Sequence, residues 1–192
     1  YQVDLIDEIW EDRPVLSEEP AFDLDVKYAG ETVAGKLARI REEMKEAGTN
    51  VHVVSTIDDI CWTLNIRGND IDFFPLVLSY GIITMDSFEL YIDEKKLDDK
   101  LKAKLAKDGV NLHPYNDIYE DVKKFGSDVV AMIDPGKLNY ALFNNIPENV
   151  KTVKKRNPAI LMKAIKNPVE IENIRKAQIK DSVAHVRFMK WL

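Results

Sequence analysis

Two pairs of aspartates carry side chains that could hold a metal ion or share a proton. Asp58 and Asp59 are adjacent, and Asp70 and Asp72 are separated by one residue. Paired carboxylates serve as metal ligands and as acid/base dyads, because two such groups can share one cation or one proton. The same pairs are common in acidic turns. We take the acidic turn as the default interpretation and keep the chemical role as the alternative.

The histidines and the cysteine form no recognisable metal motif. His52, His113 and His185 lie far apart, and no HxxH, HExxH or CxxC spacing occurs, so no local metal site is predicted. His113 precedes a proline and is interpreted as a strand-to-turn junction rather than a base. Cys61 stands on an apolar helix face, which favours a core thiol. A chain with one cysteine cannot form an internal disulfide, and this favours a reducing compartment.

Arg67 differs from the other charged residues because it lies in a predicted tight turn, Arg67-Gly68-Asn69-Asp70. From such a turn, its guanidinium could reach a carboxylate on a neighbouring molecule. An arginine with no role beyond the turn is equally compatible with the sequence.

The last helix is well defined at its start. Asn167 can act as the N-cap, Pro168 occupies the first helical position, and Glu170 is placed for a capping box. At 100° per residue, one stripe holds Ile171, Ile174, Gln178, Ser182, His185, Met189 and Leu192. Burying an unpaired polar group costs about 1–3 kcal/mol. The three polar residues of the stripe should therefore have partners or line a cavity.

These residues must be positioned by a chain that alternates helices and strands. Periodicity predicts helices over 32–47, 57–65, 97–107, 118–125 and 138–144. It predicts strands over 51–54, 76–85, 88–92, 110–112, 129–133 and 150–153. A hairpin followed by alternating helices and strands predicts an α/β domain with a mixed β-sheet flanked by helices.

The two ends of the chain are predicted to lie outside this domain. Residues 3–10 have the spacing of a helix end, and residues 11–29 combine two prolines with many acids and little periodicity. We interpret 11–29 as an inter-domain linker, with a surface loop of a single domain as the alternative. The chain begins with Tyr and has no signal-type segment, so we expect an excised piece of a longer protein.

Composition excludes two classes of partner. Lys and Arg total 27 and Asp and Glu total 33, giving a formal net charge of −6. Such an acidic chain lacks the cationic excess that phosphate neutralisation requires, so no nucleic-acid partner is expected. No apolar run approaches the roughly 20 residues that cross a bilayer, so no membrane partner is expected.

Several strings resemble the cytosolic-type X-Pro aminopeptidases (aminopeptidase P), which are pita-bread metallopeptidases similar to creatinase and prolidase. They are DEIWEDRP (7–14), STIDDICWTLNIRGND (55–70), PLVLSYGII (75–83), HPY (113–115) and KAIKNPVEIENIRKAQIKD (163–181). The resemblance implies a three-domain protein with two related α/β domains followed by a catalytic domain. Residues 1–10 would then be the tail of the first domain. Residues 30–156 would be the second, of the creatinase amino-terminal type, and residues 165–192 the first helix of a truncated catalytic domain.

The resemblance also implies the chemistry. The family hydrolyses the bond between an N-terminal residue and a following proline, with two metal ions, usually manganese, sharing a bridging water. Its ligands (two Asp, one His and two Glu) all lie beyond Leu192, so no catalytic or metal-binding residue is expected in this chain. The chain alone should be inactive. The full-length protein is expected to be a cytoplasmic homodimer that takes peptides with proline in second position.

Two residues are assigned by this resemblance. Some relatives have a histidine at the position of Gln178, in RRAHIKD where this chain has RKAQIKD. Glutamine forms hydrogen bonds but carries no charge, so a substrate contact there would be reduced to neutral hydrogen bonding. Related enzymes extend the amino-terminal half of one subunit to the partner's active site. By that analogy, Arg67 is expected at a dimer boundary, near the substrate.

Two alternatives remain open. One is a prolidase-type dipeptidase or creatinase-like enzyme, which usually has a single amino-terminal domain. The other is a binding module without peptidase activity, like the inactive pita-bread domains of some histone chaperones. The sequences before Tyr1 and after Leu192 would distinguish them.

Overall fold

A six-stranded mixed sheet lies at the centre of the structure, a computed structural model that describes residue 6 and residues 9–192. The strand order is β6-β5-β4-β2-β7-β8. Only β4 runs antiparallel to its neighbours β2 and β5, and the other pairs are parallel. The strands are β2 (Val51–Val54), β4 (Tyr80–Thr84), β5 (Phe88–Tyr91), β6 (Val110–His113), β7 (Val130–Ile133) and β8 (Lys151–Lys154). The predicted mixed α/β fold is confirmed.

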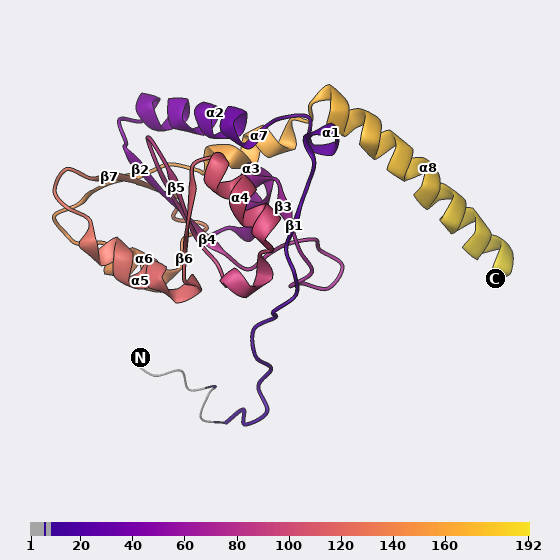
Figure 1. Ribbon diagram of the computed structural model, residues 1–192, viewed down its shortest axis with the longest axis horizontal. Helices are drawn as coiled ribbons and strands as arrows, with labels where there is room; N and C mark the ends of the chain where they lie inside the picture. The colour runs from indigo at the N-terminus through magenta and orange to yellow at the C-terminus, as the bar shows by residue number, and fades with distance from the viewer. Residues whose placement is uncertain (1–5, 7–8) are drawn as a thin grey trace.

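Helices cover both faces of this sheet (Figure 1). One face packs against α2 (Val33–Glu46), α3 (Ile57–Leu64), α4 (Asp99–Lys107) and α7 (Pro158–Ala164). The other face packs against α5 (Ile118–Asp121) and α6 (Tyr140–Asn145). Alternation along β2 directs Val51 and Val53 to the second face and Val54 to the first. Leu37, Ile40 and Met44 form a buried stripe along α2.

The helical segment predicted over 118–125 is interrupted. It consists of α5 between two 3₁₀ segments, η2 (Tyr115–Asp117) and η3 (Val122–Lys124). A further 3₁₀ turn, η1 (Glu94–Lys96), follows β5. Ile118 and Val122 are fully buried, so the apolar spacing is met although the backbone is not one continuous helix.

The turn predicted over Arg67–Asp70 is wrong. Arg67 belongs to β3 (Ile66–Arg67), which pairs antiparallel with β1 (Phe22–Asp23). The chain instead reverses four residues later, where Ile71 bridges Phe74 and Phe73 has a positive φ of 67°. A strand partner more than forty positions away in sequence prevents the earlier turn, and local turn chemistry cannot reveal that partner.

Residues 11–29 contain β1 and the short helix α1 (Val26–Ala29). Ala21 and Ala29 are buried, and the Ala21 N–H donates to the Lys96 carbonyl at 2.9 Å. The second half of the segment therefore packs on the domain that follows. The helix predicted over 3–10 lies largely outside the described residues, and within it the Trp10 N–H donates to the Ile6 carbonyl at 2.9 Å.

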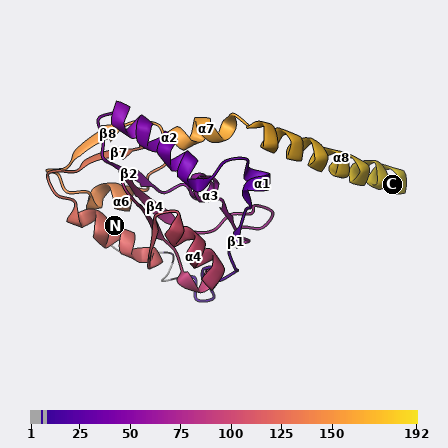
Figure 2. The ribbon, with the colours of Figure 1, turned by 45° about the horizontal axis from the view of Figure 1, so that its top comes forward.

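Helix α8 (Pro168–Trp191) extends away from the sheet and its helical layers in both views (Figures 1 and 2). Its start is as predicted, because Asn167 and Glu170 form the complete capping box with Pro168 at the first position. None of the helices in the described part of the chain is long and apolar enough to cross a membrane.

The first turn of α8 is attached to the domain through Gly30. Gly30 has φ of 72°, and a Cβ built there would lie 2.2 Å from Asn167 Oδ1. Asn167 Nδ2 also donates to the Ala29 carbonyl at 2.8 Å. This position therefore requires glycine both for backbone freedom and for the approach of the α8 cap.

We expect Gly30→Ala to loosen this attachment. Alanine in the left-handed conformation should destabilise the folded attachment by about 1 kcal/mol, and displacement of the Asn167 cap should destabilise it by about 1 kcal/mol more. Hydrogen exchange at amides 170 and 171, which donate to Asn167, should accelerate by roughly tenfold or more. Gly48→Ala is the matched control, because Gly48 has φ of 66° but nothing within 4 Å of its added Cβ. Equal exchange in the two variants would show that Asn167 does not depend on Gly30.

Candidate functional site

Gln178 lies on the exposed part of α8. No residue of α8 is buried, and the apolar members of its stripe are also exposed, with Ile171 at 39% and Met189 at 57%. The structure therefore brings no partner to Gln178, Ser182 or His185 within the described residues. These three polar side chains pay no burial penalty in this structure, because this face of α8 is exposed to solvent.

Arg67 is directed at the backbone of its own domain. Its Nη1 donates to the carbonyls of Cys61 and Ile66, both at 2.8 Å. Burial lowers the pKa of Arg67, and the nearby Cys61 and Glu170 oppose that shift. No carboxylate pairs with Arg67 among the described residues. Its guanidinium holds the end of α3 against β3.

Cys61 is a core thiol, as predicted. It is 1% exposed, and its Sγ accepts a hydrogen bond from the Val77 N–H at 3.3 Å. Burial raises the pKa of the thiol. A buried, protonated thiol is a poor nucleophile, so this residue is structural.

The loop that follows Arg67 presents apolar side chains to solvent. Phe73 is fully exposed at 101%, and Phe74 is 62% exposed. Residues 69 and 71–75 line a shallow depression of about 410 Å³. No site was predicted on this loop, although its two phenylalanines followed by a proline, in an acidic segment, are a usable signal. Exposed aromatic side chains on a turn of unusual backbone geometry are typical of contact surfaces.

The aspartate pairs do not form metal sites. Lys163 pairs with both Asp58 and Asp59, and its Nζ lies 2.7 Å from Asp59 Oδ1. Asp70 pairs with the buried Lys96 at 2.6 Å, while Asp72 lies on the exposed loop. Across residues 6 and 9–192, no three His, Cys, Asp or Glu side chains are grouped as metal ligands would be. The described residues therefore do not fit a two-metal centre.

Asp59 instead belongs to a buried polar network that fastens α7 to the sheet. Asn157 Nδ2 donates to Asp59 Oδ2 at 2.9 Å, and Thr56 Oγ1 donates to the same oxygen at 2.6 Å. His52 contacts the Met132 carbonyl through Nδ1 at 3.0 Å and Asn157 Oδ1 through Nε2 at 3.2 Å. Burial lowers the pKa of His52, although both contacts oppose that shift.

His113, at the end of β6, pairs with Glu89 at 2.6 Å and stacks on Tyr91.

Lys36 is a buried cation that the sequence pattern did not predict. Its Nζ donates to the Trp62 carbonyl at 2.7 Å and to Asn65 Oδ1 at 2.6 Å, and lies 4.3 Å from the centroid of the Trp62 ring. Burial lowers its pKa to about 8, although Glu170 and Glu31 act in the opposite direction. No carboxylate forms an ion pair with Lys36 within the described residues, so its stabilising contacts come from neutral groups.

This lowered pKa predicts a pH dependence of stability. Below pH 8 the Lys36 amine is charged in both states and is penalised in the folded one, and above about pH 10.5 it is neutral in both. The free energy of unfolding should therefore rise from pH 8 to 10.5, by at most about 3 kcal/mol, relative to Lys36→Met. Urea unfolding of both proteins across this range measures the difference. A difference that stays constant with pH would contradict the prediction.

Comparison with known proteins shows where this architecture recurs. The profile of the creatinase/prolidase N-terminal domain matches residues 12–170. Xaa-Pro aminopeptidase 1 of Dictyostelium discoideum is 37% identical and aligns over 99% of this chain and 30% of its own length. Aminopeptidase P1 of Arabidopsis thaliana is 31% identical over 98% of this chain and 33% of its own length. The chain thus spans about a third of these relatives.

Solved structures agree with the sequence comparison. The X-prolyl aminopeptidase of Caenorhabditis elegans, described as a cytosolic enzyme with a di-nuclear active site, superposes with a TM-score of 0.93 and 34% identity. That match covers 99% of this chain and 32% of the other. The Xaa-Pro dipeptidase of Bacillus anthracis superposes with a TM-score of 0.59 at 16% identity and shares the fold alone.

Proposed function

The chain belongs to the creatinase/prolidase N-terminal domain family, and from this premise we propose that it is the non-catalytic middle domain of an X-Pro aminopeptidase. The match to the C. elegans enzyme supports this most directly. It covers 99% of this chain but only 32% of an enzyme with a di-nuclear site, while the described residues here hold no metal-ligand cluster. The reacting centre is then supplied by the remaining length.

The proposed full-length protein is a metal-dependent hydrolase. It removes the N-terminal residue from peptides with proline in second position, using two manganese ions. When bound, such a pair supplies an activated water and polarises the scissile carbonyl. A cytoplasmic location is part of the proposal and is supported by the description of the C. elegans enzyme as cytosolic.

This domain contributes positioning rather than chemistry. The network of His52, Asn157 and Asp59 fixes α7, and the contacts of Asn167 fix the first turn of α8. Together they set the direction in which α8 leaves the domain (Figure 2). In the proposal, the residues that follow pack on the exposed face of α8, and Gln178 points into the pocket formed there as a neutral hydrogen-bonding residue. The domain thereby restricts access to that pocket.

The proposal also gives the domain a role in dimerisation. Phe73 and Phe74 lie on the exposed loop that follows Arg67 and supply apolar surface for a partner. Arg67 donates to the carbonyls of Cys61 in α3 and Ile66 in β3, so in the proposal it fixes the strand from which this loop starts. The homodimer is expected to be two-fold symmetric, since this is the commonest arrangement for a pair of identical chains.

One experiment tests the proposed function. The chain is expressed joined to the segment that follows it in its gene and assayed with Mn²⁺ against two peptides, one with proline in second position and one with alanine there. Release of the first residue only from the proline peptide supports the proposal. Hydrolysis of X-Pro dipeptides alone would indicate a prolidase, and no hydrolysis of any peptide would indicate a binding module.

A further inference from the structure

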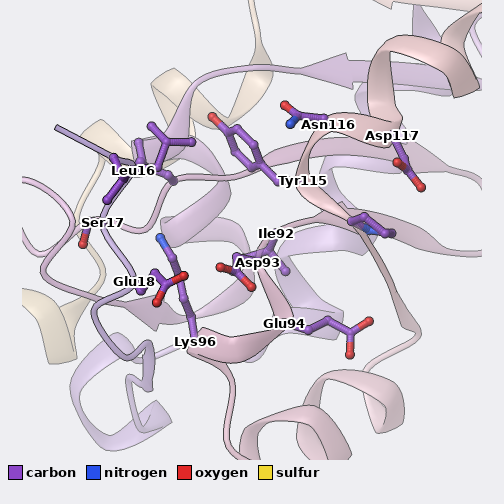
Figure 3. A pocket seen from close by; sticks show the side chains of 13 residues that line it. Leu16, Ser17, Glu18, Ile92, Asp93, Glu94, Lys96, Tyr115, Asn116 and Asp117 are labelled. Atoms are coloured by element: carbon purple, nitrogen blue, oxygen red, sulfur yellow. The ribbon is translucent and has the colours of Figure 1, made fainter. Parts of the chain in front are cut away.

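One cavity in the described part of the chain lies away from the exposed length of α8. It has a volume of about 750 Å³ and sits where β5 and β6 end, with residues 15–18 crossing one side (Figure 3). Ligands of open α/β sheets bind outside the carboxyl ends of strands. Nothing in the proposed hydrolytic function uses this cavity.

The walls of the cavity are mostly apolar. Leu16, Leu78, Ile92 and Pro114 line it together with the ring of Tyr115. The Tyr115 ring packs against Tyr80, with centroids 5.0 Å apart, so its position is supported from behind. These walls suit a ligand with an aliphatic or aromatic body, and an aromatic ring face attracts cations.

The polar groups of the cavity carry a strong excess of negative charge. Four carboxylates line it: Glu18, Asp93, Glu94 and Asp117. Glu18 pairs with Lys95 at 3.0 Å and Glu94 with Lys102 at 3.3 Å, both at exposed positions where such pairs are weak. Neither Asp93 nor Asp117 has an ion-pair partner among the described residues. In Figure 3, Glu18 lies beside Leu16 and Ser17, Asp93 lies at the centre near Ile92, and Glu94 and Asp117 lie at the right.

The one cation that lines the cavity, Lys96, is already neutralised. Its Nζ lies 2.6 Å from Asp70 Oδ2, and both side chains are almost fully buried at 3% and 1% exposure. The same Asp70 oxygen accepts from the N–H of Leu78, another lining residue, at 2.7 Å. Asp70 Oδ1 is buried without a hydrogen-bond partner. Because Asp70 neutralises Lys96, this lysine adds no net positive charge to the cavity wall.

We propose that this cavity is a binding site for an organic ammonium ion, a protonated amine attached to an aliphatic or aromatic body. The apolar walls receive the body, and Asp93 and Asp117 attract the ammonium group. An organic anion is disfavoured because Lys96 is paired and four carboxylates are among the residues that line the cavity. A bare metal ion is disfavoured because these carboxylates do not come together as ligands. The site is independent of the proposed peptidase function.

The test uses phenethylammonium as the probe. It is titrated into ¹⁵N-labelled chain, alongside the uncharged 2-phenylethanol and the anionic 3-phenylpropionate, which have similar shapes. We expect saturable shifts of amides 92–96 and 115–117 with phenethylammonium, at least tenfold weaker binding of the alcohol, and no binding of the carboxylate. Added salt should weaken the binding of phenethylammonium.

Variants identify the groups responsible. Asp93→Asn with Asp117→Asn should lower the affinity for phenethylammonium about tenfold. Both changes are conservative for folding, because asparagine replaces the Asp93 cap of η1 well and Asp117 makes no side-chain cap bond. Glu148→Gln, an exposed change away from the cavity, is the control and should leave the affinity unchanged. Equal binding of phenethylammonium and 2-phenylethanol, unchanged affinity in the double variant, or absent shifts at 92–96 and 115–117 would each overturn the proposal.

Discussion

Supplied with Mn²⁺ and a peptide that has proline in second position, the 192-residue chain alone is expected to release no N-terminal residue. Hydrolysis by a metal pair requires donors that hold both ions and their shared water. Of the candidate aspartates, Asp58 and Asp59 are engaged by Lys163 and Asp70 by Lys96, and the described residues hold no cluster of metal ligands. The rate should therefore fall by at least about 10⁶-fold relative to a complete enzyme.

Two further measurements test this prediction. Isothermal titration with Mn²⁺ should show no tight binding, and any trace of hydrolysis should separate from the chain during size-exclusion chromatography. Hydrolysis that co-elutes with the chain and is abolished by a chelator would contradict the prediction. If Asp58→Asn with Asp59→Asn then removed the activity, the metal would have to bind where we find only the Lys163 ion pairs.

The elements that sequence predicted well are those whose signals are local. The capping box of α8 was visible because Asn167, Pro168 and Glu170 are neighbours in the chain. The strand Val51–Val54 was predicted to the residue because three of its four residues are valine, which favours strands. Helix α7 carries the same kind of start, Asn157 followed by Pro158, but its seven residues are too few to show a helical period.

The site residues were harder to predict because their surroundings come from distant parts of the chain. Lys163 lies more than a hundred positions from the aspartates that it pairs with, so an acidic pair was visible and its cation was not. Arg67 was selected as a turn residue, but β1 makes that position a strand. Its proposed position at a dimer boundary depends on the loop beyond it, where Phe73 and Phe74 were the informative residues.

Asn65→Ala is expected to lower the free energy of unfolding by about 3–4 kcal/mol, the largest effect of a single substitution that we foresee. Asn65 is fully buried and ends α3 in the left-handed conformation, with φ of 52° and ψ of 39°. Its Nδ2 donates to the Glu31 carbonyl at 2.9 Å, and its Oδ1 accepts from Lys36 Nζ at 2.6 Å. Alanine loses both bonds, and a buried ammonium group loses an acceptor.

Asn65→Gly separates the contribution of the backbone conformation to stability from the contribution of the side-chain hydrogen bonds. Glycine adopts the left-handed conformation freely, so the glycine variant should be about 1 kcal/mol more stable than the alanine variant while lacking the same hydrogen bonds. Urea unfolding of the wild type and both variants measures the two contributions. Equal stability of Asn65→Gly and Asn65→Ala would show that the positive φ carries no strain.

A double-mutant cycle with Lys36→Met tests whether the stability lost in Asn65→Ala originates at the buried Lys36 ammonium group. Suppose that loss of the Asn65 Oδ1 acceptor accounts for most of the lost stability. Asn65→Ala should then lower the free energy of unfolding by about 1–2 kcal/mol less in the Lys36→Met background, because no charge is left unsatisfied there. The coupling should also weaken above pH 8, where the Lys36 amine is losing its proton in the folded state. Full additivity at every pH would place the role of Asn65 in its bond to Glu31 and in the end of α3, and not in its contact with Lys36.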